Sequence, residues 1–299
     1  MNRRGLIHCL AGSVMLAVAA GPGRVAAARA APDRVGMGTV IFRNRFEQTR
    51  PKAGAAPANP LTLLQVPEYY RERFGVRHLE FWSYHFESLE KPYLVELRER
   101  VKAAGAALIN VQVDVPYDLA SADEAERQRS LATVRQWIDA AALLGSRAIR
   151  INPGKPEGSV DQSIASLKEV NRYCQSKRLP LLTENHFGLE MNPDVHLRIR
   201  EAAGPRNVYT LPDFGNYPLD SMWESLAKII PHAYAVSAKA VDFNAQGEHL
   251  SYDFDRCVRM CERAGFKGVY LVEQWSRKDQ EFDAEKMADW LLQRVRANL

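Results

Sequence analysis

The chain has 299 residues, 46% of them hydrophobic, and a formal net charge of +4. The whole excess lies before residue 31, in Arg3, Arg4, Arg24 and Arg29, so that the remainder holds 36 basic and 36 acidic residues. This neutral remainder excludes a strongly basic surface and gives no support for binding to nucleic acid or to an anionic membrane. Roughly 270 residues of this composition are enough for one substantial core.

Residues 1–30 have the pattern of an export signal. The paired arginines precede a mildly apolar stretch from Leu6 to Ala20, and Ala28-Arg29-Ala30 forms a small-x-small cleavage site. The arginine pair is typical of a twin-arginine signal, and a general secretory signal has nearly the same layout. We therefore expect export to the periplasm or the outside of the cell, no membrane contact after processing, and one domain at residues 31–299.

The cysteines indicate neither a disulfide framework nor a zinc site. Once Cys9 leaves with the signal, an odd number remains, without a close CxxC pair: Cys174, Cys257 and Cys261. Cys257 and Cys261 are four residues apart, the spacing of packing neighbours on a helix.

Strand-like and helix-like patterns alternate along residues 31–299, which is the order of a parallel sheet covered by helices. We expect eight strands, at residues 35–42, 76–82, 107–113, 147–151, 179–184, 208–213, 233–239 and 268–273. Apolar residues recur at helical spacing between them, as in Val134, Trp137 and Ile138. Glycines before several strands are expected at left-handed helix ends: Gly75, Gly105, Gly145 and Gly265. Eight strands and roughly 250 residues predict a single (β/α)8 TIM barrel.

Residues 49–60 interrupt this rhythm with proline, alanine and glycine. Such a composition predicts a loop after the first strand, on the face where barrel active sites lie. The loop is either a lid or a surface insertion without a role in the site.

Three predicted strands end in a carboxylate: Glu184, Asp213 and Glu273. Because the carboxyl ends of parallel strands form one face of a barrel, these side chains are expected to share a pocket. Such an arrangement suits a hard divalent cation. The seventh strand carries Ser237 and Lys239 where a fourth ligand is expected. The alternative is that the carboxylates are simply paired with arginine or lysine.

Residues from about 35 to 292 resemble the xylose isomerase-like barrels of the sugar phosphate isomerase/epimerase superfamily. Five pieces carry the resemblance in chain order, at residues 76–82, 150–154, 183–186, 213–216 and Glu273. Their order and spacing are more specific for the superfamily than for any one substrate.

The resemblance implies that Glu184, Asp213 and Glu273 bind a divalent ion such as Mn, Mg, Co or Zn. A histidine on the seventh strand usually completes the set, and the matching position here is Ser237. Related epimerases also often carry a histidine shortly after the sixth-strand aspartate, where this chain has Asn216. We therefore expect either another group to complete the site or weaker metal binding.

Moving a proton beside a carbonyl group requires a base, a second acid or base, and stabilisation of the enolate. Glu184 and Glu273 are the predicted acid/base pair, and the metal is expected to polarise the substrate oxygens. Lys239 is a further catalytic candidate, because its ammonium group can hold an enolate oxygen. Alternatively, Lys239 only neutralises Asp213 or Glu273.

The predicted substrate-binding residues lie near the ends of four strands: Glu80, Trp82, His85, Arg150, Asn152, His186 and Asn216. Arg150 and Asn152 present donors to sugar oxygens, and Trp82 offers a stacking face. His186 either replaces the missing ligand, contacts a substrate hydroxyl or is structural. Capping or loop hydrogen bonding is the expected role of Gln112 and Asp114.

These residues favour a metal-assisted isomerase or epimerase that acts on a free or modified sugar. One alternative is a lyase or dehydratase that uses the same carboxylates on a keto-sugar or ketoglycoside. Another is a sugar-binding barrel without catalysis. No glycine-rich phosphate cradle is present in the sequence, and the scattered histidines do not suit a metal-dependent nuclease. A small carbohydrate is the expected partner, and a homo-oligomer remains possible.

Overall fold

The computed structural model describes residues 33–52, 57–244, 247–275 and 283–299. The predicted export signal at residues 1–30 lies outside the described residues, as does part of the predicted loop at 53–56. Among the described helices, none has the length and apolar character needed to cross a membrane.

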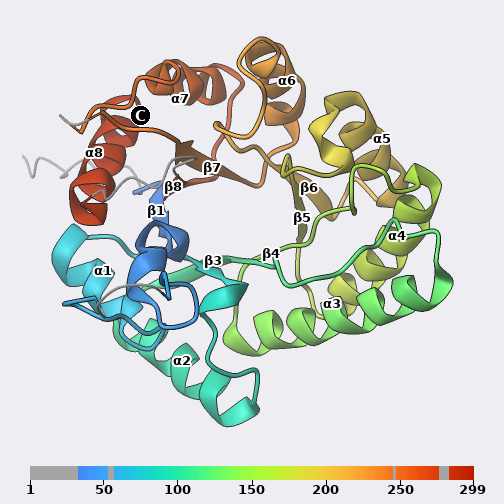
Figure 1. Ribbon diagram of the computed structural model, residues 1–299, viewed down its shortest axis with the longest axis horizontal. Helices are drawn as coiled ribbons and strands as arrows, with labels where there is room; N and C mark the ends of the chain where they lie inside the picture. Colours follow the sequence, from blue (N-terminus) through green and yellow to red (C-terminus); the bar gives the residue numbers. More distant parts are fainter. Residues whose placement is uncertain (1–32, 53–56, 245–246, 276–282) are drawn as a thin grey trace, which may run out of the picture. The chain divides into compact units, whose positions relative to one another are not determined.

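Eight parallel strands form a nearly closed barrel, and the predicted (β/α)8 fold is confirmed (Figure 1). The strands are β1 (Val35–Gly38), β2 (His78–Trp82), β3 (Ala107–Gln112), β4 (Ile149–Arg150), β5 (Leu181–Glu184), β6 (Val208–Leu211), β7 (Ala235–Ala240) and β8 (Val269–Gln274). They pair in the order β6-β5-β4-β3-β2-β1-β8-β7. Two isolated parallel bridges, Thr210 with Ala233 and Asp213 with Ser237, connect the outer strands β6 and β7.

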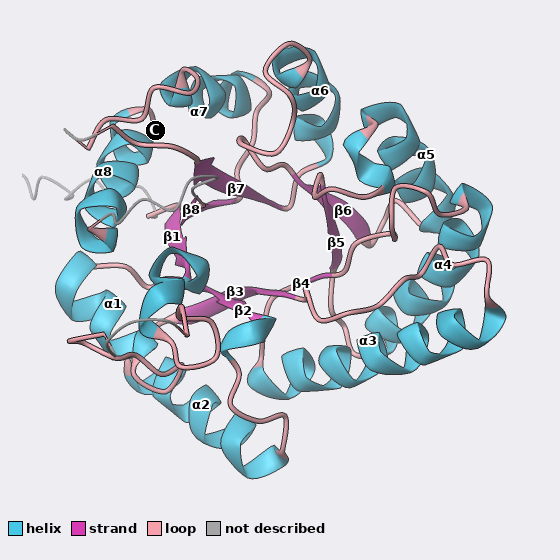
Figure 2. Ribbon diagram, viewed as in Figure 1, coloured by secondary structure: helices cyan, strands magenta, loops and turns pink. Residues whose placement is uncertain are grey.

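Helices surround the strands on the outside of the barrel (Figure 2). They are α1 (Val66–Phe74), α2 (Lys91–Ala103), α3 (Glu124–Leu144), α4 (Val160–Ser176), α5 (Pro193–Ala203), α6 (Met222–Ile229), α7 (Phe254–Arg263) and α8 (Ala284–Ala297). Four short 3-10 helices accompany them: η1 (Thr39–Arg45), η2 (Ser83–His85), η3 (Leu189–Met191) and η4 (Ile230–His232). The predicted left-handed glycines are confirmed, with φ between 61° and 81°.

The first strand is shorter than the predicted segment 35–42, because the chain leaves β1 after Gly38 and turns into η1. The Thr39 hydroxyl fixes this turn: its Oγ1 accepts from the Trp82 backbone N–H at 3.0 Å and lies 2.9 Å from His85 Nδ1. The start of η1 is thereby tied to the end of β2.

The lower part of the barrel interior is apolar, and the part nearer the carboxyl ends of the strands is polar. The apolar layer consists of Ile109, Ala148, Leu182, Leu211, Ala235 and Leu271. Side chains two residues apart on a strand point the same way. The residues two positions after Leu182, Leu211 and Leu271 therefore also face the interior, nearer the carboxyl ends of the strands; they are Glu184, Asp213 and Glu273. The apolar layer therefore supports the acidic residues from below.

Gly36 on β1 faces this interior, where no side chain fits. A Cβ atom at this position would lie 2.8 Å from His78 Cβ and 2.9 Å from Leu271 Cδ2. We expect Gly36→Ala to lower the free energy of unfolding by about 1–3 kcal/mol, the typical cost of overpacking. Urea denaturation of the purified protein measures this change.

Gly75→Asn is the matched control, because nothing lies within 4 Å of a Cβ at Gly75 and asparagine tolerates its left-handed backbone. A Gly36→Ala variant as stable as the control would contradict the packing argument.

Candidate functional site

A cavity of about 460 Å³ lies at the carboxyl ends of the strands. Seven of the residues predicted from the sequence line it: Trp82, Arg150, Asn152, Glu184, His186, Lys239 and Glu273. They come from strands spread around the barrel, so closure of the barrel brings them together.

Arg150, at the end of β4, lies on one side of this site and is almost completely buried. Its two Nη atoms donate to both carboxylate oxygens of Asp114, at 2.5 and 3.0 Å. The Trp82 indole N–H also donates to Asp114, at 2.7 Å. Burial disfavours the Asp114 carboxylate, but the charge and hydrogen bonds of Arg150 lower the pKa of Asp114 overall. Asp114 therefore holds the guanidinium group in a fixed orientation.

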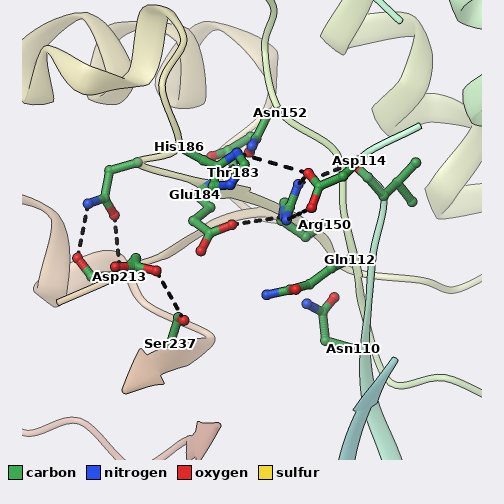
Figure 3. A network of polar contacts seen from close by, with 12 residues as sticks. Asn110, Gln112, Asp114, Arg150, Asn152, Thr183, Glu184, His186, Asp213 and Ser237 are labelled. Carbon is green, nitrogen blue, oxygen red and sulfur yellow. Dashed lines mark hydrogen bonds and ion pairs between the residues drawn. The ribbon is translucent and has the colours of Figure 1, made fainter. Parts of the chain in front are cut away.

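Glu184, at the end of β5, lies between Arg150 and Asp213 (Figure 3). Its Oε2 is 3.0 Å from Arg150 Nε, and its backbone N–H donates to Asn152 Oδ1 at 2.9 Å. Burial raises the pKa of the Glu184 carboxyl group well above its usual range despite the charge of Arg150, and the charges of Asp213 and Glu273 add to the increase. The Glu184 carboxylate is thus more basic than that of an exposed glutamate.

Lys239, on β7, connects the other two acids. Its Nζ lies 3.2 Å from Glu273 Oε1 and 3.4 Å from Asp213 Oδ2, and donates to Asn216 Oδ1 at 2.9 Å. The Ser237 hydroxyl lies 3.3 Å from Asp213 and 3.4 Å from Glu273, within reach to donate to either. Lys239 therefore neutralises both Asp213 and Glu273, which is the alternative role that the sequence indicated for it.

The three predicted metal ligands do not fit a divalent ion in this arrangement. An ammonium group already contacts Asp213 and Glu273, and a guanidinium group already pairs with Glu184. At the fourth position, Ser237 donates a hydrogen bond instead of offering an imidazole. Over the described part of the chain, no group of three or more His, Cys, Asp or Glu residues is arranged to hold a metal.

His186 contributes to the cavity wall on the Arg150 side of the site. Its Nδ1 is 3.9 Å from Asp114 Oδ1, so it does not complete the cluster of Glu184, Asp213 and Glu273. The His186 side chain is 30% exposed at the cavity, and its partial burial is the main cause that lowers the pKa of His186 to about 4. The imidazole is therefore neutral at pH 7 and offers one donor and one acceptor.

Four of the predicted residues lie outside the cavity lining: Glu80, His85, Asp213 and Asn216. The His85 ring stacks on Phe46, and its nitrogens lie 2.9 Å from Thr39 Oγ1 and 3.0 Å from Thr49 Oγ1. Both nitrogens are thus occupied, and His85 fixes the segment after β1 instead of facing a substrate. Asp213 and Asn216 lie behind the lining and hold Lys239.

Sequence reasoning assigned only capping or loop roles to Gln112 and Asp114, but both line the cavity. Asp114 orients Arg150, and Gln112 Nε2 donates to Glu273 Oε2 at 3.3 Å. The signal was the alternation of polar Asn110, Gln112 and Asp114 with valines, which places three polar side chains on one face.

Asn185 and Glu190 were also missed. The Asn185 side chain pairs with the backbone N–H and C=O of Asp213, at 2.8 and 3.0 Å. Glu190 Oε1 accepts from the backbone N–H groups of His186 and Gly188. Asn185 contacts a residue that is distant in the sequence, and Glu190 contacts backbone outside any regular helix or strand. No local sequence pattern therefore predicts either contact.

An aromatic wall covers part of the cavity, formed by Trp82, Tyr84, Tyr117, Phe187 and Trp275. Trp82 and Trp275 meet edge to face with ring centroids 6.0 Å apart. Apolar ring faces beside buried polar groups match the alternating C–H and O–H surfaces of a sugar.

The family described as "xylose isomerase-like TIM barrel" matches residues 71–294. L-ribulose-5-phosphate 3-epimerase UlaE of Escherichia coli O1:K1 / APEC is 25% identical over 222 residues, which cover 66% of this chain and 78% of that protein. Among solved structures, L-ribulose 3-epimerase superimposes with a TM-score of 0.67 at 16% identity, covering 89% of this chain and 95% of the other. A xylose isomerase-like barrel from Mycobacterium smegmatis, solved in complex with magnesium, gives a TM-score of 0.62 at 16% identity, covering 89% and 98%.

Glu80 is a buried carboxyl group below the cavity. Its Oε2 accepts from Asn110 at 2.7 Å, and its Oε1 has no hydrogen-bond partner among the described residues. Burial, followed by the charge of Glu273, raises the pKa of Glu80 to about 8. Its contribution to stability is therefore fully present below its ordinary pKa of about 4.5 and is lost as the pH rises through 8.

Glu80→Gln removes this titration. At pH 9 we expect the variant to melt at least about 4 °C above the wild type, whereas at pH 5 the two should agree within about 2 °C. Differential scanning fluorimetry across the pH range measures the gap. Glu72→Gln, on the exposed surface of α1, is the control and should follow the wild type throughout. An equal gap at both pH values would show that Glu80 does not titrate in this range.

Proposed function

Because the chain belongs to the xylose isomerase-like TIM barrel family, we propose that it is a sugar epimerase or isomerase in which Glu184 and Glu273 transfer the protons. The observation that carries the proposal is the placement of both carboxyl groups in one cavity, on strands β5 and β8, with a cationic side chain beside each. A binding protein has no need of two such carboxyl groups.

In the proposed reaction, Glu273 removes a proton from the carbon beside the substrate carbonyl group. The electron pair moves to the carbonyl oxygen, and the nearby positive charge of the Lys239 ammonium group stabilises the resulting enolate electrostatically. Glu184, whose raised pKa favours a bound proton, returns a proton to the same carbon from the other face. This sequence inverts one carbon centre and leaves the net composition of the sugar unchanged.

A neutral sugar fits the charges of the cavity better than a sugar phosphate. Arg150 and Lys239 are both paired with buried acids, and Lys155 at the rim lies within 4 Å of Asp118 and Glu126. Among the described lining residues, these are the basic side chains, because His186 is neutral at pH 7. We therefore assign a free or modified sugar as the substrate.

The predicted metal has no step in this mechanism. The related barrel solved with magnesium shows that members of the fold can contain a divalent ion. In this chain the arrangement of Lys239 and Arg150 around the three acids does not fit such an ion, and the role of electrophile is assigned to Lys239.

Two variants test the acid/base pair. We expect Glu184→Gln and Glu273→Gln each to lower kcat/KM for epimerisation by about 10²-fold or more, since each removes one proton-transfer group. In D2O, Glu273→Gln should also stop deuterium exchange into the epimer from which Glu273 removes the proton. Glu184→Gln should retain exchange without inversion.

Proton NMR of a panel of free and keto-sugars measures both the inversion and the exchange, and would also reveal elimination of a leaving group. Glu96→Gln, on the surface helix α2, is the control for the charge change. Full epimerase activity in either site variant would remove that residue from the mechanism.

We also propose that residues 1–30 direct export. If the twin-arginine route is used, Arg3→Lys combined with Arg4→Lys should leave the uncleaved protein in the cytoplasm, because that route reads the arginine pair. Cell fractionation and immunoblotting measure the distribution. Export of the double variant would indicate the general secretory route, and cytoplasmic wild-type protein would contradict export altogether.

A further inference from the structure

We propose that the Lys239 ammonium group takes the place of a divalent cation among the strand-end carboxylates, so that the cluster binds no divalent metal while Lys239 is present. The inference rests on the proposed function only for the catalytic role of Lys239. Its test measures metal binding and requires no substrate.

The geometry shows an ammonium group with all its partners supplied. An ammonium group has three N–H donors. Lys239 Nζ has three oxygen neighbours, at 2.9 Å in Asn216, 3.2 Å in Glu273 and 3.4 Å in Asp213. These partners come from the end of β8 and from the segment after β6, so the nitrogen lies where side chains from several strands meet.

The lysine stem is held in this position by packing. Lys239 is 4% exposed and lies near the carboxyl end of the β7–β8 pairing, opposite Glu273. A Cβ at Gly215 would lie 3.3 Å from Lys239 Cδ and 2.9 Å from Val241 Cγ1. The absence of a side chain at Gly215 leaves room for the stem, and the Tyr252 hydroxyl donates to the Lys239 carbonyl group.

The positive charge of Lys239 distinguishes this cluster from a site that binds a divalent cation. A divalent ion bound to Asp213 and Glu273 would share its ligands with the ammonium group, in a buried space where water screens the repulsion poorly. Ser237 strengthens the difference, since its hydroxyl group lies within donating distance of both acids.

The test compares Mn²⁺ binding by the purified full chain after treatment with EDTA, using isothermal titration calorimetry and electron paramagnetic resonance. The wild type should show no stoichiometric binding up to about 1 mM Mn²⁺. Lys239→Met should bind one Mn²⁺ with a Kd at least about tenfold lower than that concentration. Lys239→Arg retains the positive charge and is the matched control, expected to resemble the wild type.

Circular dichroism must show that each variant is folded. If Lys239→Met does not fold, Ser237→His combined with Lys239→Met replaces it, because it removes the ammonium group and adds an imidazole on the same strand. Stoichiometric Mn²⁺ binding by the wild type that is lost in Asp213→Asn would overturn the inference. Failure of every folded variant without the ammonium group to bind Mn²⁺ would also overturn it. A wild type that turns over no sugar but gives the expected binding pattern would sink only the proposed function.

Discussion

Two buried cations balance the acidic end of the barrel, and the arrangement of the cavity depends on them. Arg150 pairs with Asp114 and Glu184, while Lys239 pairs with Asp213 and Glu273. Four carboxyl groups in such a small, shielded volume would repel one another without these partners. Removal of either cation would leave buried negative charge without compensation, which is among the most destabilising changes a protein interior can undergo.

The barrel supplies the framework that makes this balance possible. Strands β3, β5, β6, β7 and β8 contribute apolar side chains to the lower layer, and polar side chains lie at or just after their carboxyl ends, so that hydrophobic burial holds the strands below the charged groups. The β2–β3 register shifts by one residue at the level of the polar layer: Leu79 pairs with Leu108, but Glu80 pairs with Asn110. Such an irregularity redirects side chains, and here it accompanies inward-facing Asn110 and Gln112.

The fold and the convergence of the strand-end acids were predictable, because both follow from local periodicity and from the common direction of parallel strands. The sequence offered pairing of Lys239 with Asp213 or Glu273 only as an alternative, and contact with both was not predictable, since a long side chain can take many rotamers and only the neighbouring strands select one. His85 was placed near a substrate because it follows β2, yet its partners Phe46 and Thr49 belong to the segment after β1. Contacts of that kind depend on tertiary packing and leave no periodic trace in the sequence.

The apolar layer beneath the acids has a kinetic consequence. Because leucine and isoleucine side chains fill the interior below Glu184 and Glu273, a molecule in the cavity has no route through the barrel and must leave by the opening through which it arrived. In the proposed reaction the substrate and the product differ at a single carbon and compete for the same cavity. Product inhibition is therefore built into the architecture, and the direction of net turnover depends on how quickly the surroundings remove one of the two sugars.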